Sequence, residues 1–122
     1  MKATQILSNL QFHDSNPNAD PLYVDRYGRV ILFALKPGQS IKGHAVPHSP
    51  FYAIVVKGHG FFAGNDGKER RFGPDDLVIF DPGEEHIARA DGEEFAFVGW
   101  LLGEPSNHSN KVGGEIAHRR DG

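Results

Sequence analysis

The sequence predicts an all-β protein of the sandwich or barrel class, and two observations carry this prediction. Turn-forming pairs such as Pro37-Gly38, Asp66-Gly67 and Pro82-Gly83 recur from Leu22 onward at intervals of roughly 8–12 residues, the spacing of short strands. The second observation is that no stretch of any length has apolar residues at the 3.6-residue period of an amphipathic helix. Short strands separated by tight turns account for both patterns.

Nine strands are expected between these turns. They are residues 22–27, 29–36, 40–46, 51–57, 60–64, 68–72, 76–81, 85–90 and 94–102. The most specific local signal is Asn65-Asp66-Gly67, because Asp-Gly between two extended runs suits a tight hairpin turn that needs a positive φ. Residues 14–20 are rich in turn formers and predict a loop, preceded by a short edge strand or a single helical turn.

The length of 122 residues fits a single domain with a modest core. We divide it into a lead-in segment, residues 1–21, a β-barrel, residues 22–102, and a polar tail, residues 103–122. The tail has only Val112 and Ile116 as apolar anchors. Because so little apolar surface cannot offset the entropy of ordering, we expect the tail to be mobile or to lie on a neighbour.

Composition argues against several kinds of site. The chain has no cysteine, so it can have neither a disulfide nor a thiolate ligand or nucleophile. Its net charge of −3 is spread along the chain without a basic stretch, and we therefore expect no nucleic-acid partner. The sequence has neither a signal-peptide pattern nor an apolar run near the ~20 residues of a membrane helix. We accordingly expect no membrane association and a cytoplasmic location.

Two of the expected strands are apolar on both faces. Residues 30–35 and 51–56 carry apolar side chains at odd and even positions alike. Because successive side chains of a strand point to opposite faces, one face would line the interior and the other needs a second sheet or a second subunit. This pattern favours a homodimer.

Residues 38–58 resemble the first motif of the cupin superfamily. Gly38, His44 and Gly58 stand at the positions of the family's first glycine, first histidine and closing glycine. Val46 stands where the family has its second histidine, and Phe51 replaces the glutamate. The first metal motif is therefore degenerate.

Residues 75–90 resemble the second cupin motif. Gly83 and His86 are kept, whereas Asp75, Asp81 and Ala90 replace the motif's glycine, proline and asparagine. Together the two motifs are similar to those of the small, single-domain, conserved-barrel cupins. This resemblance implies a double-stranded β-helix, the jelly-roll barrel of that superfamily.

The resemblance also implies a divalent transition metal: iron, manganese, nickel or zinc. Such an ion takes three or four N or O ligands, but here only His44 and His86 occupy family ligand positions. His48 is the third candidate, although in a straight strand it would stand about 13 Å from His44 at about 3.3 Å per residue. Only a turn at residues 47–50 could bring the His48 side chain close to His44. Without that approach, His48 is an exposed turn residue. A site without metal is the open alternative.

Acidic residues could supply oxygen ligands, and the histidines could act without a metal. Asp81, Glu84 and Glu85 precede His86 on a loop, where exposed acids are usually solvated. In a metal-free site His44 or His86 could serve as a general base, because imidazole titrates near neutral pH.

The apolar replacements favour a dry interior pocket. Val46 and Phe51, together with Phe33, Phe97 and Trp100, indicate an aromatic pocket for a small, partly apolar ligand. Ordinary core packing is the alternative role for these side chains.

We therefore expect a small-molecule-binding cupin of unknown substrate with an incomplete or atypical metal site. The alternative is a metal-dependent enzyme of the dioxygenase or isomerase type. A third hypothesis is a stability or assembly protein with a filled barrel. The interior volume and the geometry of the metal ligands distinguish these three.

Overall fold

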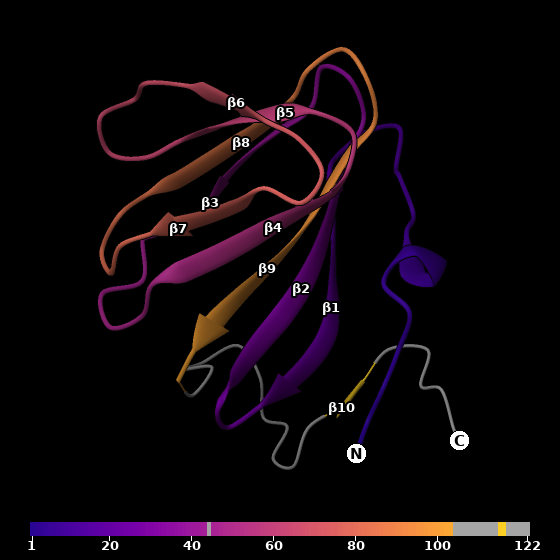
Figure 1. Cartoon of the computed structure of the whole chain (residues 1–122), viewed down its shortest axis with the longest axis vertical. Coiled ribbons are helices and arrows are strands. Elements are labelled where there is room, and N and C mark those ends of the chain that lie inside the picture. Colours follow the sequence, from indigo (N-terminus) through magenta and orange to yellow (C-terminus); the bar gives the residue numbers. More distant parts are fainter. Residues whose placement is uncertain (44, 104–114, 117–122) are drawn as a thin grey trace.

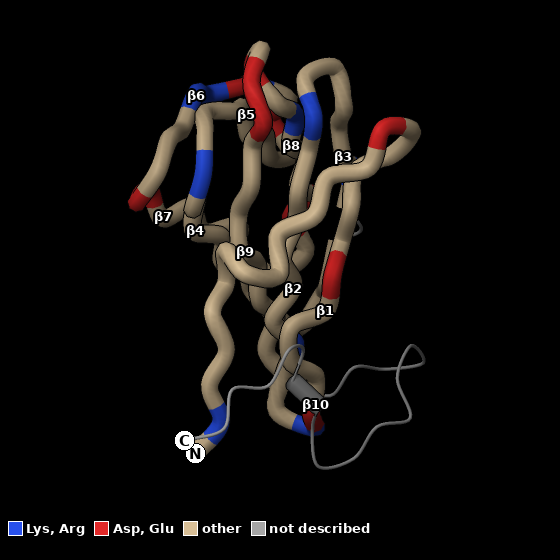
Figure 2. The backbone as a smooth tube through the Cα atoms, turned by 90° about the vertical axis from the view of Figure 1, so that its right-hand side faces the viewer, with Lys and Arg blue, Asp and Glu red and all other residues tan. Residues whose placement is uncertain are grey.

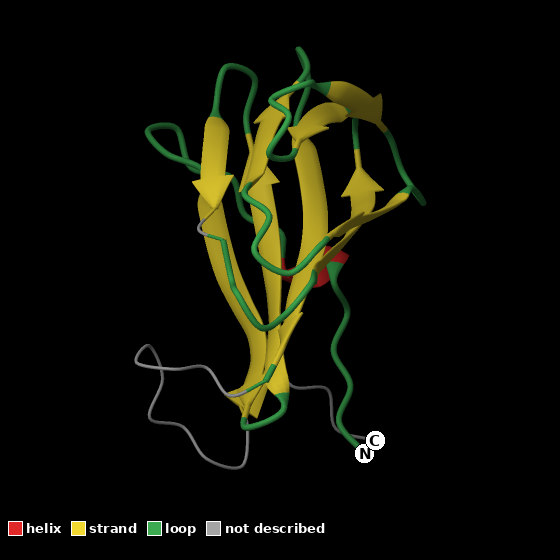
Figure 3. Cartoon of the chain, turned by 90° about the vertical axis from the view of Figure 1, so that its left-hand side faces the viewer, coloured by secondary structure: helices red, strands yellow, loops and turns green. Residues whose placement is uncertain are grey.

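The computed structural model describes residues 1–43, 45–103 and 115–116, and these form two antiparallel sheets that face each other (Figures 1 and 3). The six-stranded sheet has the order β10-β1-β2-β9-β4-β7 and the four-stranded sheet the order β3-β8-β5-β6. The strands are β1 (Asn18–Asp25), β2 (Gly28–Leu35), β3 (Ser40–Gly43), β4 (Phe51–Lys57), β5 (Gly60–Ala63), β6 (Arg70–Phe72), β7 (Leu77–Phe80), β8 (His86–Ala90), β9 (Phe95–Leu102) and β10 (Glu115–Ile116). The all-β prediction is confirmed.

Strand β1 begins earlier than expected. Residues 18–20 were assigned to a loop, but they pair with Ala34, Phe33 and Leu32 of β2. The turn-forming composition is overridden here because β2 offers a continuous partner for the backbone. Pro21, which has no N–H to donate, lies where the register between the two strands shifts.

The two ends of the chain add small elements. Before β1, residues Leu7–Asn9 form a single 3-10 turn, η1, which is one of the two alternatives expected there. The expected polar tail lies outside the described residues except for Gly103 and strand β10. No strand was expected in that tail, and β10 pairs with Tyr23 and Val24 of β1.

The turn positions of the motifs have the left-handed backbone that their glycines suggest. Gly38, Gly58 and Gly83 have φ values of 84°, 69° and 82°. Gly67 has a φ of 70°, and its N–H donates to the carbonyl oxygen of Gly64 at 3.0 Å. The β5–β6 connection is nevertheless longer than the tight hairpin expected, since pairing resumes only at Arg70.

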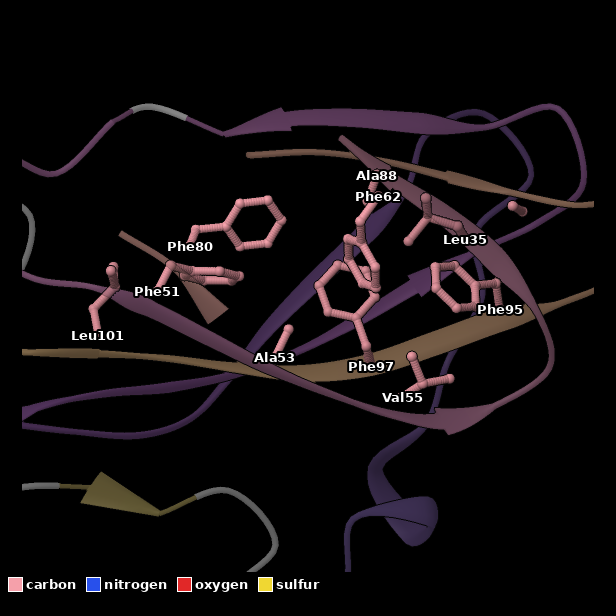
Figure 4. Close-up of a cluster of buried hydrophobic side chains, with 11 residues drawn as sticks. Leu35, Phe51, Ala53, Val55, Phe62, Phe80, Ala88, Phe95, Phe97 and Leu101 are labelled. Atoms are coloured by element: carbon pink, nitrogen blue, oxygen red, sulfur yellow. The ribbon is translucent and has the colours of Figure 1, made fainter. Parts of the chain in front are cut away.

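Aromatic side chains fill the space between the sheets (Figure 4). The buried members of this interior cluster are Leu35, Phe51, Ala53, Val55, Phe62, Phe80, Ala88, Ala90, Phe95, Phe97 and Leu101. Rings from both sheets meet edge to face, as for Phe62 and Phe97 at 4.9 Å and 77°. Such contacts add to the stabilisation from buried apolar area.

A second apolar cluster lies on the outer face of the six-stranded sheet. Leu22, Leu32 and Val98 form its buried part, and Ile6 and Leu10 of the N-terminal segment pack against them. The second apolar face of these strands is therefore covered partly by the chain's own N-terminus, a cover that the sequence patterns did not suggest.

The outer face of the four-stranded sheet is polar by contrast. The Arg89 guanidinium lies 4.1 Å from the centre of the Phe61 ring and pairs with Glu69. Arg71 pairs with Asp91 at 2.7 Å. Figure 2 shows basic and acidic residues interspersed along the described chain.

Asp75 gives a stability prediction, because it is a non-glycine residue with a φ of 75°. Left-handed backbone costs a non-glycine residue about 1 kcal/mol or more, and the exposed Asp75 occupies the glycine position of the second motif. We expect Asp75→Gly to raise the free energy of unfolding by roughly 0.5–1 kcal/mol, measured by urea denaturation. Asp81→Gly is the control, an exposed aspartate without positive φ, and an equal gain there would contradict this explanation.

Candidate functional site

A cavity of about 70 Å³ lies between the sheets, within the aromatic interior. Its lining residues are Phe33, Ile41, Gly43, Phe51, Phe62, His86, Ala88 and Phe97. Among these described residues His86 is the one polar side chain. The candidate site is therefore a small apolar cavity with an imidazole in its wall.

His86 is held against the backbone of strand β3. It is the first residue of β8 and lies directly opposite Gly43 in the register of the two strands. A Cβ atom on Gly43 would come within 2.0 Å of the imidazole ring. The ring can occupy this place only because residue 43 has no side chain.

The Phe51 ring stacks on the imidazole. The ring centres are 4.2 Å apart and the planes are 13° from parallel. On its other side Phe51 lies over Gly99 of β9, where a Cβ atom would be 2.3 Å from Phe51 Cζ. Phe33 and Phe97 stack on each other at 4.8 Å and continue the aromatic wall.

Alternation along the strands divides the five expected pocket residues. Phe33, Phe51 and Phe97 line the cavity together. Trp100 lies on the opposite face of β9 from Phe97 and stacks on Tyr52 at 5.2 Å, so it does not line the cavity. Val46 is half-buried and packs against the interior cluster beyond the cavity wall.

The structure describes two of the three expected histidine ligands, and of these two His86 lines the cavity. His86 lines the cavity, whereas His48 is exposed on the turn that begins at Pro47. His44 lies outside the described residues. The turn before β4 is fixed instead by Ser49, whose buried hydroxyl donates to the Pro50 carbonyl and accepts from the Leu102 N–H.

The acidic residues before His86 have structural partners. The Glu84 carboxylate accepts from the Asp81 N–H at 3.0 Å. Glu85 lies 3.7 Å from the Lys42 ammonium, and both side chains are largely exposed. Asp81 is exposed on the turn.

His59 lies at the far end of the barrel from His86. Its Nδ1 is 3.0 Å from Glu93, and this hydrogen bond holds the pKa of the Glu93 carboxyl below its ordinary value. The ring also lies against Gly73, where a Cβ atom would approach it to 2.6 Å. Both side chains are partly exposed, and neither lines the cavity.

The described donor set does not fit a complete transition-metal centre. Among residues 1–43, 45–103 and 115–116, no group of three or more His, Asp or Glu side chains is arranged to hold an ion. The cavity wall supplies His86 alone from the described residues. A first-row divalent metal needs three or four such donors.

Several lining residues were missed at the sequence level. They are Ile41, Gly43, Phe62 and Ala88. Ala88 follows His86 by two residues in β8, so alternation places both side chains on the same face of the strand. That signal could have identified Ala88. The others depend on the pairing of β8 with β3 and with β5, which no local pattern specifies.

Comparison with known proteins points to one family. A family model described as "Cupin domain" matches residues 31–101. None of the curated proteins matches significantly. In the described part of the chain, no helix is long and apolar enough to cross a membrane.

Solved structures share the fold at low sequence identity. An uncharacterized protein with a double-stranded β-helix domain from Klebsiella pneumoniae is 21% identical, with a TM-score of 0.78, covering 94% of this chain and 96% of that one. A Cupin_2 domain of an XRE family transcriptional regulator from Enterobacter cloacae is 20% identical, with a TM-score of 0.65, covering 71% and 96%. A sugar phosphate isomerase from Silicibacter pomeroyi is 20% identical, with a TM-score of 0.57, covering 65% and 52%. The expected double-stranded β-helix is thereby confirmed.

The close approach of His86 to Gly43 gives a second prediction. We expect Gly43→Ala to lower the free energy of unfolding by about 1–3 kcal/mol, because the new methyl group overlaps the imidazole and forces it to move. The ring's displacement should also shift the His86 Cε1–H resonance. Lys42→Ala in the same strand is the control, with an expected change within about 0.5 kcal/mol. An unmoved His86 resonance in Gly43→Ala would contradict the described packing.

Proposed function

Because the chain belongs to the Cupin_2 family of cupin domains, we propose that it is a small-molecule-binding protein whose ligand occupies the interior cavity beside His86. The cavity carries this proposal: it is apolar, it lies inside the barrel, and one imidazole is in its wall. Small-molecule sites typically combine apolar walls with a few polar groups that orient the ligand. The metal site is incomplete in this proposal.

The volume restricts the ligand to a few non-hydrogen atoms. Drug-sized ligands occupy pockets of about 300–1,000 Å³, whereas water occupies about 30 Å³ per molecule in the liquid. A cavity of about 70 Å³ therefore accepts a molecule about the size of a short alcohol. A larger ligand would have to displace the Phe51 ring, which lies between His86 and Gly99.

The metal-dependent enzyme is the second candidate function, and its support is the family rather than the described residues. His86 faces the cavity, but Phe51 stands at the glutamate position of the motif and its ring covers one face of the imidazole. An aromatic ring offers no ligand atom to a first-row metal. This loss of a donor favours binding without a complete metal centre.

Two neighbours illustrate what related barrels do. One belongs to a transcriptional regulator and one is a sugar phosphate isomerase. A sensing module is consistent with the small apolar cavity. An isomerase site for a sugar phosphate would need groups that bind a phosphate, and the described cavity wall has no lysine or arginine side chain.

Titration with short alcohols tests the ligand site. We expect ethanol and 1-propanol to produce saturable shifts of the Ile41 methyl resonances, and 1-hexanol to produce none, because the longer chain exceeds the cavity. Ala88→Leu fills the cavity and should abolish the response. Ala45→Leu makes the same change at an exposed position and should leave it intact. An equal response in Ala88→Leu would place the ligand elsewhere.

Elemental analysis of protein purified without chelator separates the two candidate functions. The proposed function predicts less than one transition-metal ion per chain. A stoichiometric ion that is lost in His86→Ala and kept in His48→Ala would instead establish the metal-dependent alternative. His48 is a suitable control because its side chain is exposed and outside the cavity wall.

We also propose that the protein is a homodimer formed through the outer face of the six-stranded sheet. The relevant surface, here termed the outer patch, comprises Tyr52, Ile54, Leu77, Ile79 and Trp100. Leu77 and Ile79 are 55% and 53% exposed on β7, the edge strand of that sheet. The other three side chains are partly buried. A contiguous apolar surface of this kind favours association with another surface.

Sedimentation at micromolar concentration tests the dimer. We expect a species of twice the 13.4 kDa chain mass, and we expect Ile79→Lys to shift it to monomer by placing a charge in the apolar interface. Tyr27→Lys is the control, since Tyr27 is 71% exposed at the β1–β2 turn and outside the outer patch. A wild-type protein that sediments only as a monomer would refute the dimer.

A further inference from the structure

Three loops meet at the end of the barrel where His86 lies. They are residues 45–50 before β4, residues 64–69 between β5 and β6, and residues 81–85 between β7 and β8. Figure 1 shows all three at the same end of the two sheets. The 81–85 loop contacts both others, and its last residue is followed directly by His86.

Reciprocal hydrogen bonds join the 81–85 loop to the 64–69 loop. The Glu84 carboxylate accepts from the Asn65 N–H at 3.4 Å, and the Asn65 side-chain oxygen accepts from the Glu85 N–H at 2.9 Å. The same carboxylate accepts from the Asp81 N–H at 3.0 Å, which closes its own loop. One carboxylate therefore fixes the shape of the loop and its attachment to the opposite sheet.

Two further contacts complete this arrangement. A Cβ atom on Gly64 would be 2.1 Å from Glu84 Oε2, so the carboxylate occupies space that any other residue at position 64 would fill. On the third side, the Gly83 N–H donates to the Val46 carbonyl at 2.8 Å. The loop is thus tied to both neighbouring loops across the barrel end.

We propose that residues 81–85 form a lid at the end of the barrel where His86 lines the interior cavity. The Glu84 carboxylate, which accepts from the Asn65 N–H and fills the space beside Gly64, is the latch that holds this lid in place. Release of the latch frees the loop from the four-stranded sheet and leaves it attached at Val46. Because the loop leads directly into His86, its opening exposes the imidazole and the cavity beside it. The strands that form the core keep their pairing, since the latch involves loop residues only.

Chemical modification of His86 measures this opening without any ligand. Diethylpyrocarbonate reacts with accessible imidazoles, and peptide mass spectrometry gives the rate at His86 relative to the exposed His48 in the same molecule. His86 Nε2 is buried, so we expect slow modification in the wild type. In Glu84→Ala we expect the ratio of rates to rise by about tenfold, the effect of losing a hydrogen-bonded carboxylate at a loop.

Three variants make the test specific. Gly64→Ala leaves Glu84 in place but fills its receiving space, and should raise the ratio as well. Glu84→Gln keeps an oxygen acceptor without the charge, so its ratio of modification rates should lie between those of the wild type and Glu84→Ala. Glu85→Ala is the matched control, a neighbouring glutamate whose carboxylate faces the exposed Lys42, and should leave the ratio unchanged.

Amide hydrogen exchange supplies a second readout. The N–H groups of Asn65, Asp81 and Glu85 should exchange faster in Glu84→Ala, while those of β4 and β9 keep their protection. An unchanged His86 ratio in folded Glu84→Ala would overturn the latch. An equal rise in Glu85→Ala would also overturn it, because the loosening would then be general.

The lid is independent of what the cavity binds. If the alcohol titration fails while the modification ratio responds as expected, the proposed ligand site is wrong and the lid stands. If alcohols bind and the ratio does not respond, the ligand site stands and the lid is wrong.

Discussion

The stack of the Phe51 ring on the His86 imidazole requires two places in the sheets where the backbone carries no side chain. Gly43 provides one beneath the imidazole and Gly99 provides the other beneath Phe51. With both rings in place, the remaining aromatic side chains reduce the interior to a cavity of about 70 Å³. The size of the cavity, its apolar lining and the position of the one imidazole among its described lining residues all follow from this fit.

The same stack explains why the family motif and the candidate site differ in chemistry. The glycines that shape the turns are retained, since Gly38, Gly58 and Gly83 all have positive φ. A ligand position, by contrast, is occupied by Phe51, which contributes dispersion contacts and excludes water but offers no lone pair. The glycines that the turns need and the side chains that would bind a metal are therefore independent features of the motif. This chain keeps the turn glycines and lacks the ligand at position 51.

Sequence patterns predicted the strand bounds well where a local apolar run marks the strand, and poorly where contacts with distant residues determine where the strand begins. Strand β4 has the expected bounds, residues 51–57, because its apolar run is bounded by a proline and a glycine. The start of β1 was wrong because pairing with β2 overrides the local preference of residues 18–20. The facing of Trp100 follows from alternation along β9 once Phe97 points inward. The covering of Leu32 by the N-terminal segment depends on contacts distant in sequence, which no local period encodes.

Strand β7 has a further consequence for the behaviour of the protein in solution. Its sequence, Leu77 to Phe80, is wholly apolar, and its outer edge has no partner among the described strands. Such an edge is a template for cross-β growth. The residues that bracket it, Asp75 and Asp76 before and Asp81 after, are exposed aspartates. Their mutual repulsion opposes stacking of one copy's edge on another's, so these acids act as gatekeepers against edge-to-edge association.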